Sequence, residues 1–259
     1  MERLGNHYKK TGISIHALRI WGLMFLAAGI IGRGVLQNHI LGFTGLNTQQ
    51  MLEIMASSET AMNYATLSIA LQALETCAAP IFAVLLVEGV MRTTDFDKYF
   101  TRILGIGLIT EIPYNLCMGK GLLDFSDRNP MLTLALGLLV IFFYQRYSGK
   151  GFKNVAIKVL VTVAALCWVK MLSIDFGTPM LVLIVVLWCC RSKGMYRNFI
   201  GASAAMACTL FSPFFLASPM SFLAIHMCNW EECEENRTVN YFSYPAVLLL
   251  AFAVGKFLF

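Results

Sequence analysis

Runs of apolar residues recur along nearly the whole 259-residue chain and constrain its fold more than any other feature. A bilayer crossing needs about 20 mainly apolar residues, because each residue advances a helix by about 1.5 Å. The runs lie at 17–36, 65–91, 103–117, 131–144, 155–172, 179–190, 199–216, 220–228 and 241–259. We therefore predict an all-α, polytopic integral membrane helix bundle with 8–9 transmembrane helices, formed as a single domain over residues 1–259.

The composition supports this class of protein. Hydrophobic residues make up 58% of the chain and charged residues 14%, whereas soluble domains carry about a quarter charged residues. The first residues lack the apolar core of a cleavable signal peptide, so we expect the first run to act as an uncleaved anchor. No nucleic-acid binding is expected, because the basic residues are dispersed over several loops.

The positions of the lysines and arginines predict the orientation. If the N-terminus is cytoplasmic and each run crosses once, fourteen of the 20 Lys and Arg residues fall inside and four fall outside. Arg237 and Lys256 remain unassigned. Cytoplasmic loops carry an excess of Lys and Arg, so we predict a cytoplasmic N-terminus. Whether the short run 220–228 crosses the bilayer stays open.

Several polar side chains interrupt the apolar runs. A charge at the bilayer centre costs at least about 2.5–3.5 kcal/mol, so these groups should face a protein interior or a wet cavity. Glu88 and Arg92 are four residues apart and share a helix face, where an interfacial ion pair is the simpler interpretation. Glu111 and Asn115 are also four apart, and Glu111 lies too deep for a solvated face.

Other polar residues have structural interpretations beside the functional ones. Asn129 precedes a proline and suits a helix cap, and Asp175 suits a helix start, where the dipole favours a carboxylate. Arg128 either binds an anionic group or marks the outer interface. No metal site is predicted, since the histidines and cysteines show no strong ligand spacing. The further polar residues that we expect to line a cavity are Arg19, Arg128, Asn129, Thr133 and Asp175.

Three segments, read in order, resemble the TraX family of polytopic membrane proteins, which is related to wider transmembrane acyltransferase families. They are APIFAVLLVEGVMRTTDFDKYFTRILGIGLITEIPYNL, DRNPMLTLALGLLVIFFYQR and SIDFGTPMLVLIV, at 79–116, 127–146 and 173–185. The similarity is strongest over 79–146 and collinear toward both ends. The positions that carry it are Pro80, Phe82, Glu88, Gly89, Glu111, Pro113, Tyr114, Asn115, Asn129 and Thr133.

The resemblance implies acyl transfer in the bacterial cytoplasmic membrane. TraX proper is associated with N-terminal acetylation of conjugative pilin, so acetyl-CoA or another cytoplasmic acyl-CoA is the implied donor. The implied acceptor is an amine or hydroxyl of a protein N-terminus, a glycan or a lipid. Arg92, Lys98 and Arg102 would meet the phosphates of CoA. The candidate catalytic residues implied by the resemblance are Glu88, Glu111 and Asn115, of which Glu88 and Glu111 would serve as base or orienting group.

The chain departs from the family at the residues expected to move a proton. The family carries an Asp-His pair in its first helix, and the matching positions here are Gly29 and Ile30. A second expected histidine position holds Val247. His16, His39 or His226 would have to replace them.

Three functional hypotheses follow. The first is an acyltransferase with a rebuilt site, and the second is a non-catalytic relative, a pseudoenzyme that keeps the bundle for partner or ligand binding. The third is a small-molecule or lipid transporter that reuses the cavity. The lipid bilayer is an expected partner in all three.

Overall fold

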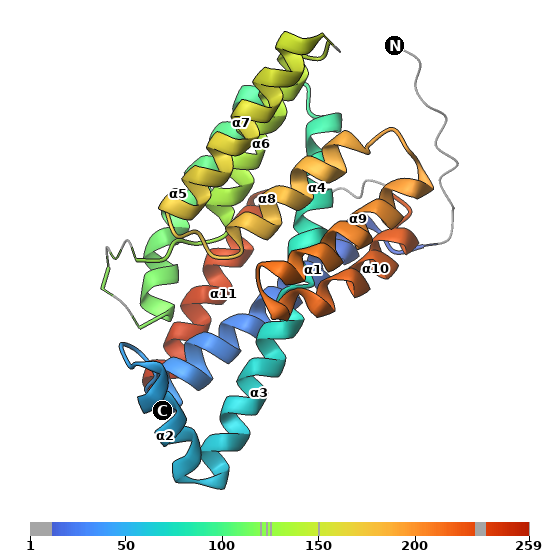
Figure 1. The fold of residues 1–259 in the computed structure, drawn as a ribbon. Helices are drawn as coiled ribbons and strands as arrows, with labels where there is room; N and C mark the ends of the chain where they lie inside the picture. The colour runs from blue at the N-terminus through green and yellow to red at the C-terminus, as the bar shows by residue number, and fades with distance from the viewer. Residues whose placement is uncertain are drawn as a thin grey trace.

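The structure is a computed structural model that describes the chain at residues 12–119, 121, 122, 124, 126–149, 151–230 and 237–258. Over these residues it is all-helical, with 81% helix and no strands (Figure 1). This confirms the predicted all-α class. The elements are α1 (Ile15–Ile30), η1 (Ile31–Ile40), α2 (Thr48–Ser57), α3 (Glu59–Glu75), α4 (Ala78–Arg92), α5 (Phe96–Cys117), α6 (Met131–Arg146), α7 (Phe152–Met171), α8 (Gly177–Cys189), α9 (Met195–Ala207), η2 (Cys208–Leu210), η3 (Pro213–Met220), α10 (Ser221–Met227) and α11 (Arg237–Leu258).

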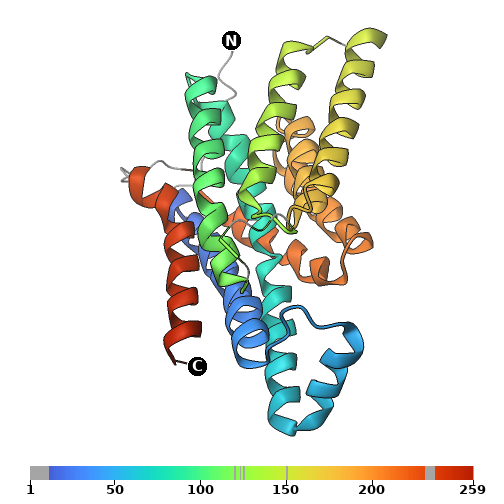
Figure 2. The ribbon, with the colours of Figure 1, turned by 90° about the vertical axis from the view of Figure 1, so that its left-hand side faces the viewer.

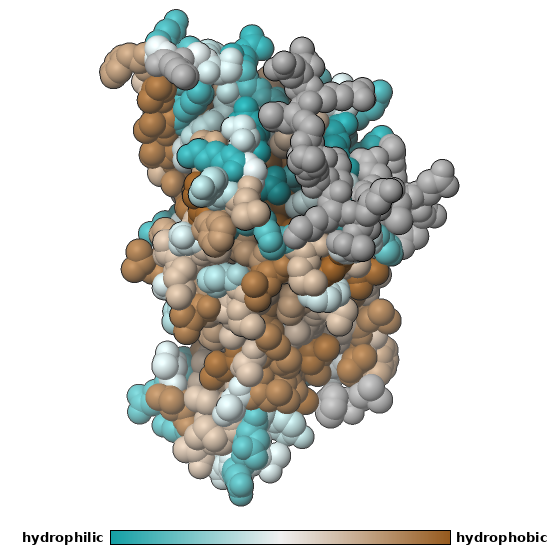
Figure 3. Space-filling model, turned by 90° about the vertical axis from the view of Figure 1, so that its right-hand side faces the viewer, coloured by the Kyte–Doolittle hydropathy of each residue, from teal (hydrophilic) through white to brown (hydrophobic). Residues whose placement is uncertain are grey.

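The described helices have the lengths and apolar surfaces of a membrane-embedded protein. Three helical stretches are long and apolar enough to cross a bilayer: Ile15–Ile40, Glu59–Arg92 and Phe152–Met171. Several shorter apolar helices accompany them. Apolar residues dominate the middle of the face in Figure 3, between ends richer in hydrophilic residues. The exposed apolar helices would contact lipid, whereas the number of crossings and the orientation stay predictions.

Two helix connections that are flanked by basic residues lie at the same end of the bundle. Figure 2 shows the α4–α5 and α6–α7 connections at its top, opposite α2 and the C-terminus. Lys98 and Arg102 lie at the start of α5, and Arg146 and Lys153 flank the second connection. We call this end of the molecule the basic end.

The first apolar run continues as a π-helix, which sequence periodicity did not predict. Ser14 caps α1, since its hydroxyl accepts a hydrogen bond from the Ala17 backbone N–H at 3.1 Å. From Ile31 to Ile40 the backbone is a ten-residue π-helix. Gly32 lets α3 approach closely, and the Ser68 hydroxyl donates to its carbonyl at 2.8 Å. Such segments are rare and frequently accompany functional sites.

The second run, 65–91, bends in the middle. The structure ends α3 at Glu75 and begins α4 at Ala78. At the bend the Thr76 hydroxyl donates to the carbonyl oxygens of Ala73 and Phe214, at 2.7 and 3.0 Å. The bend buries Glu75, whose side chain is 3% exposed and lies against Gly29 of α1.

The predicted run 199–216 is wrong as a single element. Helix α9 ends at Ala207, and the chain turns back through η3 and α10, which pack against α9 (Figure 1). Ser212 is extended, at φ −155° and ψ 128°, because a residue before proline is pushed out of the helical region. The run near Met220 therefore belongs to the return leg of this hairpin.

Candidate functional site

A cavity of about 850 Å³ runs along α1 and α4 from the basic end toward the middle of the bundle. Its lining on α4 extends from Ala78 to Arg92, which corresponds to a depth of about 20 Å. The walls are mainly apolar, and helices α5, α6, α8 and α11 also contribute to them. The charged and phenolic residues that line it are Arg19, Glu75, Glu88, Arg92, Tyr99, Arg102, Tyr241 and Tyr244.

Glu88 lines the large cavity at the basic end, which we call its mouth, and pairs there with two arginines. Its carboxylate contacts Arg92 at 3.9 Å, so the ion pair expected from the spacing is present. The shorter contact, 2.5 Å, is with Arg197 at the start of α9, a partner that the sequence did not indicate. Arg92 also donates to the Trp230 carbonyl at 3.0 Å, and the Arg197 guanidinium stacks over the Trp230 ring. Glu88 thus joins α4 to α9 at the cavity mouth.

We expect Glu88→Gln to destabilise the fold by about 1–3 kcal/mol, because it removes the charge that compensates two largely buried guanidinium groups. Thermal unfolding of the purified protein in nanodiscs measures the effect. Glu53→Gln on the exposed face of α2 is the matched control and should leave the transition unchanged. Equal melting of the two variants would contradict a structural role for Glu88.

The structure separates the three cations predicted to bind CoA phosphates. Arg92 and Arg102 line the large cavity, and so does Arg19. Lys98 does not: it pairs with Asp95 at 2.9 Å on the surface, with 72% of its side chain exposed. Hydrogen bonds from the Lys98 side chain and backbone lower the pKa of Asp95. The basic lining of the mouth is therefore Arg19, Arg92 and Arg102.

At the inner end of the large cavity lies a charge cluster of Glu75, which is buried, with Arg33 and Asp175, which are largely buried. Arg33 donates to both oxygens of Glu75, at 2.9 and 3.0 Å, and contacts Asp175 at 2.5 Å. The Tyr114 hydroxyl donates to Asp175 at 3.3 Å, and Arg33 also lies over the ring of Phe176. The cluster joins η1, α3, α5 and the segment before α8.

Gly29 makes room for this cluster. A Cβ atom at position 29 would overlap the Glu75 carboxylate. The carboxylate of α3 therefore occupies the space that a side chain on α1 would fill. Neither Glu75 nor Arg33 was among the predicted site residues, because the two are 42 residues apart and no local pattern links them.

A second, more polar pocket of about 560 Å³ lies on the other side of the cluster. Arg33 and Asp175 line it, whereas Glu75 lines the large cavity, and Phe176 lines both. The other lining residues come from η1, the loop after it, the end of α5 and the α7–α8 connection: Gln37, Asn38, Phe43, Thr44, Gly45, Tyr114, Met118, Asp127, Ser173 and Ile174. The charge cluster thus separates two cavities.

Two backbone hydrogen bonds join the α5–α6 connection to the α7–α8 connection and so place Asp175 in the cluster. The Arg128 backbone donates to the Ser173 carbonyl at 3.1 Å, and the Asp175 backbone donates to the Arg128 carbonyl at 2.9 Å. Phe176 follows in the left-handed conformation, at φ 53°, which is uncommon for a non-glycine residue and often marks functional segments. Asp175 was predicted at a helix start; its carboxylate turns to Arg33 instead of capping α8.

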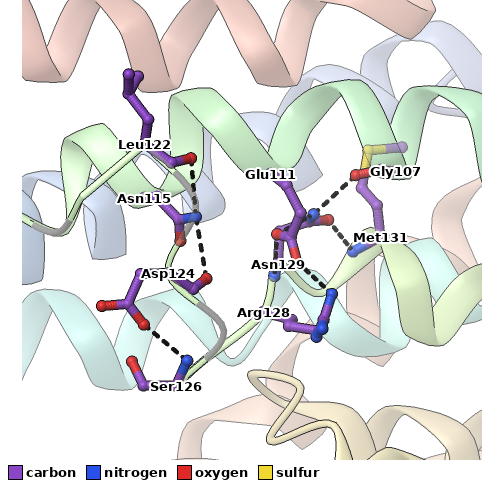
Figure 4. A network of polar contacts seen from close by, with 9 residues as sticks. All are labelled: Gly107, Glu111, Asn115, Leu122, Asp124, Ser126, Arg128, Asn129 and Met131. Carbon is purple, nitrogen blue, oxygen red and sulfur yellow. Dashed lines mark hydrogen bonds and ion pairs between the residues drawn. The ribbon is translucent and has the colours of Figure 1, made fainter.

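Glu111 and Asn129 form a separate network that closes the α5–α6 connection (Figure 4). Glu111 accepts hydrogen bonds from the Asn129 backbone at 3.1 Å and side chain at 2.8 Å, and it contacts Arg128 at 3.6 Å. Asn129 also donates to the Gly107 carbonyl and accepts from the Met131 N–H, while Pro130 holds the N-cap position of α6. Asn115 donates to two backbone carbonyls of the same connection.

This network lies outside the linings of both cavities. Glu111, Asn115, Arg128, Asn129 and Thr133 do not line either one. A catalytic role for Glu111 or Asn115 stays a prediction, while their contacts supply a structural role. The candidate replacement histidines are not in the linings either: His39 packs against Gly255 and Phe252, and His226 is exposed on α10.

The fold and the site together define an α-helical membrane protein with a deep cavity, arginines at its mouth and a buried carboxylate at its inner end. The comparisons with known proteins identify the family. A family model described as TraX protein matches residues 36–254, most of the chain, so the chain belongs to the TraX family. Neither the curated proteins nor the solved structures gave a match.

Proposed function

We propose that the protein is an acyltransferase of the bacterial cytoplasmic membrane. It takes an acyl group from cytoplasmic acyl-CoA, with acetyl-CoA as the expected donor, and transfers it to an amine or hydroxyl on a protein N-terminus, a glycan or a lipid. The observation that carries the proposal is the large cavity, which has three arginines at its mouth, apolar walls and a carboxylate at its inner end.

The chemistry of the lining suits this donor. Guanidinium groups bind phosphates through paired hydrogen bonds, and CoA carries several phosphates at one end. Apolar walls suit the pantetheine arm and acyl group, which would extend from the arginines toward Glu75. A volume of about 850 Å³ falls in the usual range for small-molecule and cofactor sites.

Acyl-CoA binding should depend on the arginines of the mouth. We expect Arg19→Gln and Arg102→Gln each to raise the Kd for acetyl-CoA roughly tenfold, the loss of about 1.4 kcal/mol expected for a charge-assisted contact. Lys153→Gln, an exposed cation at the same end and outside the lining, is the control. Calorimetric titration in nanodiscs measures the Kd. Unchanged affinity in both arginine variants would remove the mouth as the phosphate site.

Turnover tests the proposal itself. Purified protein in nanodiscs is given acetyl-CoA, and free CoA is followed with a thiol reagent. Release of CoA supports the acyltransferase, and binding without release supports the non-catalytic relative. The second candidate function is a transporter, because two cavities lie on opposite sides of one charge cluster. Uptake of labelled acetyl-CoA into vesicles that contain the protein tests this alternative.

A further inference from the structure

We propose that Glu75 is the catalytic residue that accepts the proton of the acyl acceptor. This inference rests on the proposed acyl transfer. It adds the identity of the base, which the sequence left among Glu88, Glu111 and three histidines.

Two carboxylates lie where they could act as the base. Among the described residues, Glu75 and Glu88 are the carboxylates that line the large cavity. They lie at opposite ends of it, Glu88 near the C-terminus of α4 and Glu75 just before its N-terminus. A donor whose phosphates meet the arginines of the mouth directs its acyl group away from Glu88 and toward Glu75.

The two carboxylates also differ in the number of cations that surround them. Glu88 contacts two guanidinium groups, those of Arg92 and Arg197, and opposite charges favour a carboxylate that keeps its charge. At the inner end, Glu75 and Asp175 share the single guanidinium of Arg33. Ion pairs within the described residues give this cluster no second cation. Two carboxylates and one guanidinium leave the cluster with one net negative charge. Such a charge is unfavourable at membrane depth, so the cluster is suited to take up a proton.

The two carboxylates of the cluster are not equivalent. Glu75 lines the large cavity, where the donor would lie, whereas Asp175 lines the small pocket and accepts the Tyr114 hydrogen bond. Arg33 holds both oxygens of Glu75 and fixes its orientation. Glu75 can thus exchange a proton with a group in the large cavity while Asp175 keeps the charge of Arg33 compensated.

Every bond and proton in the proposed step is accounted for. The acceptor N–H or O–H gives its proton to Glu75 as its nitrogen or oxygen bonds to the acyl carbon. The C–S bond of the thioester then breaks, and the electron pair leaves with the CoA sulfur. Glu75 returns the proton to this thiolate, so that the products are the acylated acceptor and free CoA and no oxidant or reductant is needed.

The test compares Glu75→Gln, Glu75→Asp and the exposed control Glu53→Gln in the full chain in nanodiscs. The probes are acetyl-CoA as donor and ethanolamine, which offers both an amine and a hydroxyl, as acceptor. Glu75→Gln leaves Arg33 paired with Asp175, so the variant is expected to fold. We expect kcat to fall by about 10²–10⁴-fold with the Kd for acetyl-CoA changed less than about twofold. Glu75→Asp should keep part of the activity.

A spectroscopic measurement separates proton transfer from a structural role. Infrared difference spectra on acidification should show a carbonyl band of a protonated carboxyl group that is lost in Glu75→Gln and kept in Glu53→Gln. If the natural protein turns over and folded Glu75→Gln matches it, or if the band persists in Glu75→Gln, Glu75 is not the base. If the natural protein releases no CoA, the proposed function fails first, and this inference fails with it.

Discussion

Gly29→Ala is expected to destabilise the protein by roughly 3–5 kcal/mol, although alanine is the better helix former. A Cβ atom at position 29 would overlap the Glu75 carboxylate. To make room, Glu75 must move off Arg33, which leaves a buried guanidinium with one contact fewer and a displaced carboxylate in an apolar interior. Overpacking and a broken buried ion pair both contribute to the loss. Thermal and denaturant unfolding in nanodiscs measures it.

The matched control for Gly29→Ala is Gly105→Ala on α5. A Cβ atom at position 105 meets nothing within 4 Å, so this variant should be as stable as the natural protein or up to about 1 kcal/mol more stable. Equal stability of the two alanine variants would contradict the close approach of Glu75 to α1.

Moving the carboxylate should rescue the site. In the double variant Gly29→Asp/Glu75→Ala the carboxylate on α1 enters the space that Glu75 vacates, and we expect it to recover most of the stability lost by Gly29→Asp alone. This bears on any attempt to restore the Asp-His pair that the family resemblance implies at Gly29 and Ile30. Such a restoration needs Glu75 shortened at the same time. A double variant no more stable than Gly29→Asp would show that the two positions do not share one space.

Arg33→Met is expected to have the second large effect, a loss of about 3–5 kcal/mol. Methionine keeps much of the side-chain volume but removes the one guanidinium that contacts both Glu75 and Asp175. The two carboxylates are left without a cation at membrane depth and can persist only by taking up protons. Unfolding at neutral pH in nanodiscs measures the loss.

Two further variants show whether uncompensated charge or lost packing causes the loss of stability in Arg33→Met. Arg146→Met makes the same chemical change at an exposed position of the basic end and should be close to neutral. The triple variant Arg33→Met/Glu75→Gln/Asp175→Asn removes all three charges together and should regain part of the stability, since burying no charge is often no worse than burying a balanced set. If the triple variant were as unstable as Arg33→Met, lost packing and not uncompensated charge would explain the effect.

Local patterns predicted the features that depend on near neighbours. The spacing of Glu88 and Arg92 indicated a contact that the structure contains, because residues four apart lie on one helix face. Asn129 was predicted to cap the next helix; its side chain accepts a hydrogen bond from the Met131 N–H, but the N-cap position of α6 is held by Pro130, one residue later. The family resemblance, read from segments in order, is confirmed by the match over residues 36–254.

The features that the sequence missed depend on segments far apart in the chain. Arg197 reaches Glu88 across 109 residues, and Arg33 reaches Glu75 across 42. Arg33 is one of the four basic residues that the predicted orientation places outside, yet it lies on a π-helix with its guanidinium paired to Glu75 and its side chain only 21% exposed. A single sequence shows the residue types that can form an ion pair but not which of several distant partners is within reach.

The sequence by itself determined the class of the protein. Apolar runs of bilayer length require helices, because lipid offers no hydrogen-bonding partner to an exposed backbone. Only the tertiary structure decided which polar residues form the site. Glu75, Arg33 and Asp175 meet at the boundary between two cavities. They are brought there by the α3–α4 bend, by the π-helix after α1 and by the space that a glycine leaves at position 29. Burial fixes these contacts, since charges this deep must find partners within the protein, and the folded backbone sets which partners lie within hydrogen-bond distance.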